Sequence, residues 1–454
     1  MDSSVSFGVG RRTINPEMTV SLAGYFNARI ATEVFDDIEV RALVLRKNGK
    51  SFLLLHFDLI TVTDRLYHGV MDAIADLTEF SPENVLMTAI HTHTASDYRP
   101  SSQVYDPACI AQIIREAAKA VREAAAQNRA GAVFCTQTSD DRFLFNRRYW
   151  MKNGTVLTNP GKLNPEIDRP EGEIDPDIPL CAVRDESGEI AVLLAGIVNH
   201  TDTIGGTEVS ADWTGFLHRE LEKRMAPGGV MFTLVGASGN INHFDTSTDM
   251  NQTCYAEAKR IGLGYAETVK AALPLLKPVD TTVFRTFYAE LKVGAAEVSD
   301  GEVAEAKATL EKYRDVPTPA EAGIMLTSEQ LAAGDPVAVK FFAGELLRTA
   351  ENKKPFVFRL SGLEIGGIVF ASLPSEPFTE IGLEIRKKIF ADKICFVVSH
   401  GNGTGSLDNS GGYIPNLWNY GRGGYETEVM SNPFERHTGE KLAEAWRKMK
   451  EGNA

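Results

Sequence analysis

Continuous apolar runs recur along the chain, and each ends in polar residues that can do chemistry. Runs without polar alternation are typical of strands buried on both faces of a sheet. The predicted strands cover residues 51–57, 85–90, 190–198, 231–235, 368–373 and 394–398. Between them, apolar residues at helical spacing predict helices over residues 63–77, 106–125, 213–225, 254–276 and 379–390. The alternation predicts an α/β fold with a mixed, largely buried sheet flanked by helices.

Two segments depart from this pattern. Residues 299–353 are rich in Glu, Ala and Lys, with helix signals over 300–314 and 328–351. We expect them to form a helical insertion within a single domain of residues 1–454. Residues 401–424 are dense in Gly and Asn and almost without periodicity. A long irregular loop inside a compact protein is usually functional or mobile.

Composition excludes several classes of protein. The 454 residues are 43% hydrophobic, enough for a large core without a disulfide scaffold. With 47 Lys and Arg against 61 Asp and Glu, the net charge is −14, which argues against nucleic acid or an anionic membrane as partner. No apolar run approaches a membrane span, and no signal peptide is visible, so a cytoplasmic location is expected. A homo-oligomer is compatible with all of this.

The five cysteines are Cys109, Cys135, Cys181, Cys254 and Cys395. They are far apart and form no CxxC pair, so we interpret them as reduced thiols rather than a zinc cage.

His91-Thr92-His93 follows the predicted strand at 85–90 and is the sharpest local signal. In α/β sheets, ligands bind beyond the carboxyl ends of the strands. In an extended segment, residues i and i+2 point to the same side. His91 and His93 could bind one metal together, or one could bind while the other handles protons. The alternative is a pair of hydrogen-bonded or surface histidines.

His200 and Glu376 also follow predicted strands. Taken singly, His200 is more often a structural histidine, and Glu376 is a first-turn acid favoured by the helix dipole. Together with the His91 motif they make a sensible ligand set for a borderline metal. Zinc is the default, one ion per chain, because catalytic zinc sites use such ligands and keep a position for water.

Asp58 follows the predicted strand at 51–57, and Asp212 lies in the loop before the predicted helix at 213–225. Both are candidates to orient a ligand histidine. Asp212 is equally well placed to cap the helix that begins at Trp213.

Other polar residues are candidates to contact a substrate. Asn240, Asn242 and His243, in a Gly-rich turn, could donate hydrogen bonds to a substrate or a developing oxyanion. Arg147 and Arg148 could bind a substrate carboxylate or phosphate, or form solvated ion pairs. No G-x-S-x-G elbow, P-loop lysine or H-E-x-x-H motif is present.

The order and spacing of short motifs resemble the neutral (non-lysosomal) ceramidase family. The matching pieces are Gly8-Val-Gly-Arg, Leu22-Ala-Gly-Tyr25, Thr88-Ala-Ile-His-Thr-His-Thr, Asn146-Arg-Arg148, Asn199-His200, Ser210-Ala-Asp-Trp-Thr-Gly215, Gly239-Asn-Ile-Asn, Leu373-Pro-Ser-Glu376, Gly412-Tyr-Ile-Pro415 and Gly423-Gly-Tyr-Glu426.

The resemblance implies a zinc-dependent amide hydrolase of α/β type. It implies that His91, His200, Glu376 and Tyr413 bind the zinc, and that His93 handles a proton or a hydrogen bond beside it. Tyr413 follows from the resemblance alone.

Two departures from the family change the expected substrate. Asn242 stands where the family's G-D-x-S-P-N motif has its active-site serine, and no C-terminal sandwich domain is expected. We therefore expect amide cleavage in a small polar N-acyl compound rather than in ceramide. Cleavage of a glycosidic or ester bond at the same site, or metal and ligand binding without turnover, are the alternatives.

Overall fold

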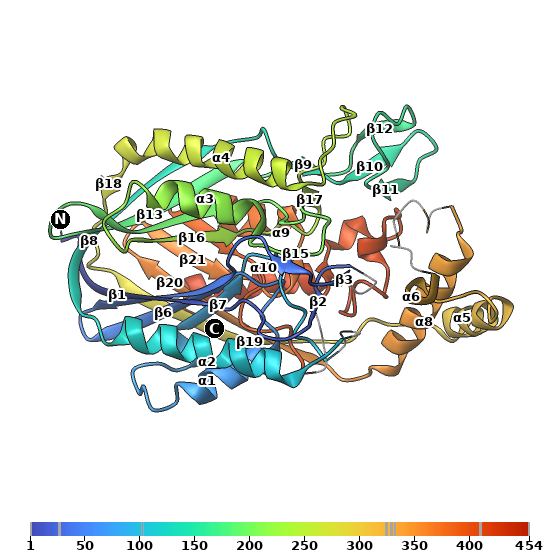
Figure 1. Ribbon diagram of the computed structural model, residues 1–454, viewed down its shortest axis with the longest axis horizontal. Coiled ribbons are helices and arrows are strands. Elements are labelled where there is room, and N and C mark those ends of the chain that lie inside the picture. Colours follow the sequence, from blue (N-terminus) through green and yellow to red (C-terminus); the bar gives the residue numbers. More distant parts are fainter. Residues whose placement is uncertain are drawn as a thin grey trace.

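Two β-sheets packed face to face form the centre of the molecule (Figure 1). The computed structural model describes residues 2–25, 29–100, 102, 104–322, 326, 330, 333–407 and 411–452. The core between the sheets contains Leu54 and Phe232 from the larger sheet and Phe370 from the smaller one. The predicted class, a mixed α/β fold, is confirmed.

The larger sheet is mixed. Its strand order is β16-β14-β13-β8-β1-β5-β6-β7, and β18 also pairs with β8. The strands are β1 (Ser4–Thr13), β5 (Glu39–Lys47), β6 (Lys50–Phe57), β7 (Val85–Ala89), β8 (Arg129–Ser139), β13 (Asp177–Asp185), β14 (Ile190–Ile197), β16 (Val230–Val235) and β18 (Lys277–Pro278). Only the outermost pairs, β6–β7 and β14–β16, are parallel within this ladder. Four strands of this sheet were predicted from the sequence. They form the pairs at its two edges, β6 with β7 and β14 with β16.

The smaller sheet has the order β19-β20-β21-β23. Its strands are β19 (Phe284–Val293), β20 (Phe356–Ile365), β21 (Ile368–Ser372) and β23 (Ile394–Val398). The β21–β23 pair is parallel and the other pairs are antiparallel.

Helices cover the outer face of each sheet. Leu53 and Leu55 pack under α1 (Asp64–Ala73) and α2 (Pro107–Ala125), whereas Leu54 faces the other sheet, because successive strand residues alternate between faces. Next to them, α3 (Asp212–Glu222) and α4 (Tyr255–Ala272) cover β13, β14 and β16. The smaller sheet is covered by α9 (Thr379–Leu383), its π-helical continuation Glu384–Ile389, and α10 (Thr438–Glu451).

Helix starts agree with the residues that predicted them. The Thr63 side chain accepts from Leu66 N at the start of α1, and Asp106 accepts from Ala108 N at the start of α2. The five predicted helices are confirmed in position, although the first and third end four and three residues before their predicted ends, at Ala73 and Glu222.

The segment 299–353 is helical where it is described. It contains α5 (Asp300–Lys312), α6 (Pro319–Ala322) and α8 (Pro336–Glu351), at the end of the molecule opposite the N-terminus (Figure 1). The predicted helix start at residue 328 lies outside the described residues. A capping box formed by Ser299 and Glu302 begins α5. That the segment is an insertion in one domain stays a prediction.

The loops beyond the strand ends contain further short β-sheets of two or three strands. They are β2 (Ser21–Leu22) with β3 (Arg29–Ile30), β4 (Glu33–Val34) with β15 (Glu208–Val209), β9 (Phe145–Asn146) with β17 (Ile241–Asn242), β10 (Arg148–Met151) with β11 (Val156–Thr158) and β12 (Ile167–Pro170), and β22 (Glu376–Pro377) with β24 (Tyr413–Ile414). No helix in the described part of the chain combines the length and apolar character that a membrane span requires.

Candidate metal centre

Strands from both sheets end at one place. His91 follows β7, His200 follows β14, and Glu376 follows β21. Ile60, which follows β6, and Ser238, which follows β16, supply backbone carbonyls to the same cluster. Residues far apart in sequence therefore meet because the strands that carry them end side by side.

Two short backbone pairings bring the functional side chains together in pairs. Thr92 and Thr201 form a parallel bridge, and His93 N donates to Thr201 O at 3.1 Å. This pairing sets the His91 motif beside His200. Likewise β22 and β24 pair so that Glu376 is directly opposite Tyr413.

The three imidazoles and the Glu376 carboxylate lie within a few ångströms of one another. His91 Nε2 lies 3.0 Å from His200 Nε2 and 3.3 Å from His93 Nε2. Glu376 Oε2 is 3.3 Å from His91 Nε2 and 3.8 Å from His200 Nε2. His91, His93 and His200 are the one group of three or more potential metal ligands found among the described residues.

The tautomers of two histidines follow from their carbonyl partners. His91 Nδ1 lies 2.7 Å from Ile60 O, and His200 Nδ1 lies 3.2 Å from Ser238 O. A carbonyl only accepts, so each Nδ1 carries a hydrogen and donates it. The Nε2 atoms of the two rings face each other across 3.0 Å, and the neutral form of each ring would direct its lone pair into the same space. This arrangement fits a shared cation.

Protonation at the cluster suits a metal. Burial, followed by the proximity of His91, lowers the pKa of His93 and of His200 well below the usual value, so both rings are neutral, the metal-binding form. Burial alone would raise the pKa of Glu376, but His91, Arg147 and Tyr413 outweigh it and lower the pKa. Glu376 is therefore an ionised carboxylate beside the neutral rings of His93 and His200.

Two further residues at the cluster were not predicted as site residues. His400 follows β23 and stacks on His91, with ring centroids 4.1 Å apart and planes at 13°. Asp202 lies 3.4 Å from His93 Nδ1 and accepts a hydrogen bond from Tyr25 at 2.5 Å. Burial raises the pKa of Asp202 to about 7.

Backbone strain gathers around the cluster. His91 has φ 66°, Ser375 has φ 54° and His400 has φ 56°, a region that residues other than glycine rarely adopt. Such strain is typical of functional sites, where the surrounding structure holds residues in costly conformations.

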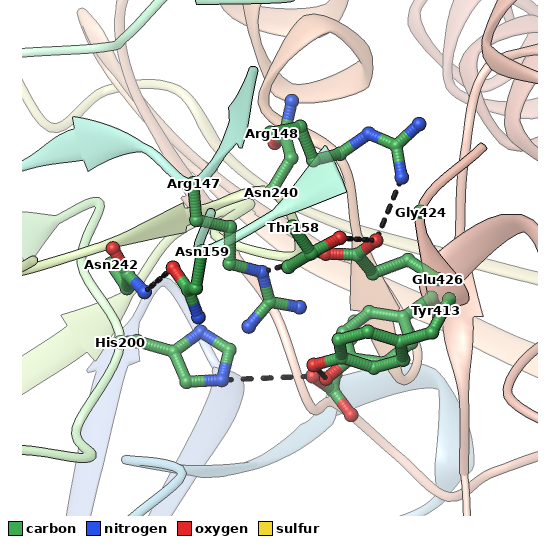
Figure 2. Close-up of polar contacts among 12 residues, drawn as sticks. Arg147, Arg148, Thr158, Asn159, His200, Asn240, Asn242, Tyr413, Gly424 and Glu426 are labelled. Carbon is green, nitrogen blue, oxygen red and sulfur yellow. Dashed lines mark hydrogen bonds and ion pairs between the residues drawn. The ribbon is translucent and has the colours of Figure 1, made fainter. Parts of the chain in front are cut away.

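Arg147 lies beside the cluster. Its guanidinium sits over the Tyr413 ring, 4.9 Å from the centroid, and 5.7 Å from the centroid of Tyr425. Arg147 Nε donates to Glu426 Oε1 at 3.0 Å, while Nη2 is buried without a hydrogen-bond partner among the described residues. In Figure 2 the guanidinium points toward the space between His200 and Tyr413. Tyr425, whose hydroxyl is 3.2 Å from that of Tyr413, was not predicted as a site residue.

Arg148 points the other way. It is fully buried and donates to Glu426 at 2.7 Å (Figure 2) and to Glu171 at 2.5 Å. Its contacts hold together the loops around the site rather than facing the cluster.

The Gly-rich turn after β16 has mixed roles. Asn240 accepts from Thr379 N at 2.8 Å and donates to Glu380 at 3.0 Å, which ties the turn to the start of α9. His243 Nε2 lies 2.7 Å from Gln252 O, and its contact with a substrate stays a prediction. Asn242 donates to Asn159 at 2.9 Å.

The two candidate orienting acids bond elsewhere than to a ligand ring. Asp58 pairs with Arg41 Nη1 at 2.9 Å and accepts from Glu39 N at 2.9 Å. Asp212 accepts from Thr203 N at 2.9 Å and Ile204 N at 3.2 Å, in the loop that follows His200. Its neighbour Trp213 donates from Nε1 to His200 O at 2.9 Å. Asp212 can therefore influence the position of His200 only through the backbone of the loop at Thr203 and Ile204, and not by a hydrogen bond to the His200 ring.

Neither a protein-family model nor a curated protein sequence matches this chain. Solved structures do match. A crystal structure of neutral ceramidase from Pseudomonas aeruginosa superposes with a TM-score of 0.72 at 17% identity, over 99% of this chain and 74% of that one. A structure of ceramidase complexed with C2 gives a TM-score of 0.72 at 16% identity, over 99% of this chain and 75% of that one.

The chain has the neutral ceramidase fold. The resemblance predicted from short motifs is confirmed at the level of fold, and almost the whole chain takes part in it. In this ceramidase fold the predicted residues His91, His93, His200, Glu376 and Tyr413 lie together, with Arg147 beside them.

Proposed function

We propose that the protein is a zinc-dependent hydrolase that cleaves an amide bond in a small polar N-acyl compound. The single observation that carries the proposal is the pair of facing Nε2 atoms of His91 and His200, 3.0 Å apart, with the Glu376 carboxylate 3.3 Å from the first. The likeness to ceramidase structures supports the choice of an amide over an ester or a glycosidic bond.

The metal would be held by His91, His200, Glu376 and Tyr413. A catalytic zinc supplies Lewis acidity and lowers the pKa of a bound water to about 7. The donor set is right for it, since imidazole nitrogens with a carboxylate are common zinc ligands.

The location in the cytoplasm and any homo-oligomer stay predictions.

The remaining residues would bind the substrate and move a proton. Arg147 Nη2, a buried N–H donor without a partner among the described residues, would donate to an oxygen of the substrate. His93 would accept a proton on Nε2, which faces the cluster, while Asp202 lies near its Nδ1. Tyr413 and Tyr425 enclose the Arg147 guanidinium and limit its freedom to turn away.

Metal removal tests this proposal. We expect the purified protein to release free amine from N-hexanoylglycine or a similar short N-acyl compound, to lose this activity on dialysis against a chelator, and to regain it with Zn²⁺. Parallel assays would use short N-acyl sphingosine, p-nitrophenyl esters and p-nitrophenyl glycosides. If only esters or only glycosides are cleaved, the bond that the protein hydrolyses is not an amide. Full activity in the metal-free protein would contradict the proposal that the reaction depends on zinc.

A further inference from the structure

Asn159 stands at the metal centre although no motif marks it. It follows β11, its backbone N donates to Arg147 O at 2.7 Å, and it has φ 47°, a conformation that Asn tolerates better than most residues. Figure 2 shows its side chain between Asn242 and the group formed by Arg147 and His200.

A chain of two hydrogen bonds fixes which end of the Asn159 amide faces the centre. The backbone N of Phe244 donates at 3.1 Å to Asn242 Oδ1, so the oxygen of Asn242 must lie on that side. The Nδ2 of Asn242 is then left to donate to Asn159 Oδ1, at 2.9 Å. It follows that the free end of Asn159 is Nδ2, an N–H donor, with no protein partner among the described residues.

Asn159 Nδ2 and Arg147 Nη2 are both N–H donors without a partner among the described residues. The backbone hydrogen bond from Asn159 N to Arg147 O holds the two residues on paired segments, and Figure 2 shows both side chains directed toward the His200 side of the site. Donors that reach one site can bind an acceptor oxygen there, and a charged guanidinium favours an oxygen that carries or develops negative charge. In Asn242 itself, Oδ1 already accepts from Phe244 N, and one N–H of Nδ2 already donates to Asn159.

We propose that Asn159 Nδ2 donates a hydrogen bond to an acyl or carboxylate oxygen of the substrate beside Arg147, and that Asn242 is a positioning residue that sets the direction of the Asn159 amide. This inference rests on the proposed function for its substrate, but its readout is the affinity for a ligand, which is separate from the rate of cleavage. It also gives a use to the asparagine at position 242, where the resembling family has serine.

The test is titration calorimetry of the zinc-loaded protein with two probes, sodium hexanoate and N-hexanoylglycine. We expect Asn159→Asp to weaken binding at least tenfold, because it replaces the donor by a negative acceptor of the same shape. If only N-hexanoylglycine is affected, the bound oxygen belongs to the carboxylate on the amine side. If hexanoate is affected too, it belongs to the acyl group. Either result supports the inference, and an unchanged affinity for both probes overturns it.

A second variant tests the positioning role. In Asn242→Asp the Phe244 N–H still has its acceptor, but the other oxygen now faces Asn159 and forces its amide to turn, so that Oδ1 faces the ligand. We expect a loss similar to that of Asn159→Asp, and no further loss when Asn242→Asp is added to Asn159→Ala. A further loss in that background would show that Asn242 contacts the ligand itself and would overturn the inference.

Controls separate this inference from the proposed function. Asn153→Ala removes an exposed asparagine whose side chain caps a turn at Thr155, and should leave both affinities within twofold. Wild-type protein that binds the probes through Asn159 but cleaves no amide would contradict the proposed function alone. Wild-type protein that binds neither probe would overturn the inference.

Discussion

Replacing His91 with alanine is expected to remove bound zinc and turnover together while the protein stays folded. His91 Nε2 is the nearest common neighbour of His200, His93 and Glu376, so its loss removes the nitrogen around which the other donors gather. We expect metal content, measured by elemental analysis after dialysis, to fall from one ion per chain to near zero, and amide cleavage to fall to background.

A matched control is His437→Ala, which removes an exposed histidine at the start of α10. It should leave metal content and activity unchanged. Circular dichroism and thermal unfolding would show that both variants fold. His91→Ala protein that keeps a full equivalent of zinc, or that keeps its activity, would be incompatible with a metal centre at this position.

Among the substitutions proposed here, replacing Glu426 with alanine is expected to lower the free energy of unfolding most. Glu426 is fully buried and accepts from Arg147 at 3.0 Å, Arg148 at 2.7 Å and Thr158 at 2.6 Å. Its removal leaves buried guanidinium charge without its counter-ion. Breaking a buried ion pair on one side costs about 3–5 kcal/mol in free energy of unfolding. Denaturation with urea would measure the change.

The control for this variant is Glu311→Ala, which removes an exposed carboxylate paired with Arg314 at 2.9 Å. Exposed pairs of this kind contribute about 0–1 kcal/mol. We also expect Glu426→Ala to lower activity more than its loss of stability explains, because Glu426 orients Arg147 through Nε. A loss of stability no larger than that of Glu311→Ala would show that the guanidiniums find other partners or solvent.

The parts of the fold that follow from apolar pattern were predictable. Strands such as β7 and β14 are buried along their whole length, so a continuous apolar run marks them. The middle of the larger sheet was not found, and β8 shows why. Its eleven residues are mostly half-buried and include Arg129, Gln137 and three glycine or alanine positions, so neither a continuous run nor a clean alternation appears.

The candidate metal centre was predictable where a proposed ligand stands within a few residues of the end of a buried strand. His91, His200 and Glu376 each do so. Tyr413 lies in a glycine-rich loop with no periodicity, and the short β22–β24 pairing that delivers it cannot be seen in the sequence.

Residues not predicted as site residues were missed for different reasons. His400 stands after the predicted strand 394–398, as His200 stands after its strand, so the same signal could have found it. Asn159 has a positive φ of 47°, which depends on the surrounding structure rather than on the local sequence. Tyr425 begins a single 3₁₀ turn in the glycine-rich loop. The positions of Asn159 and Tyr425 at the cluster follow from tertiary packing, which spacing along the chain does not reveal.

The most direct test of the metal centre is X-ray diffraction from crystals of the zinc-loaded protein, with data collected on both sides of the zinc absorption edge. We expect one anomalous peak per chain, about 2.0–2.2 Å from the Nε2 atoms of His91 and His200 and from a carboxylate oxygen of Glu376, with a coordination position left for water. A peak elsewhere, or no peak within bonding distance of His91 and His200, would contradict the shared metal on which the proposed function depends.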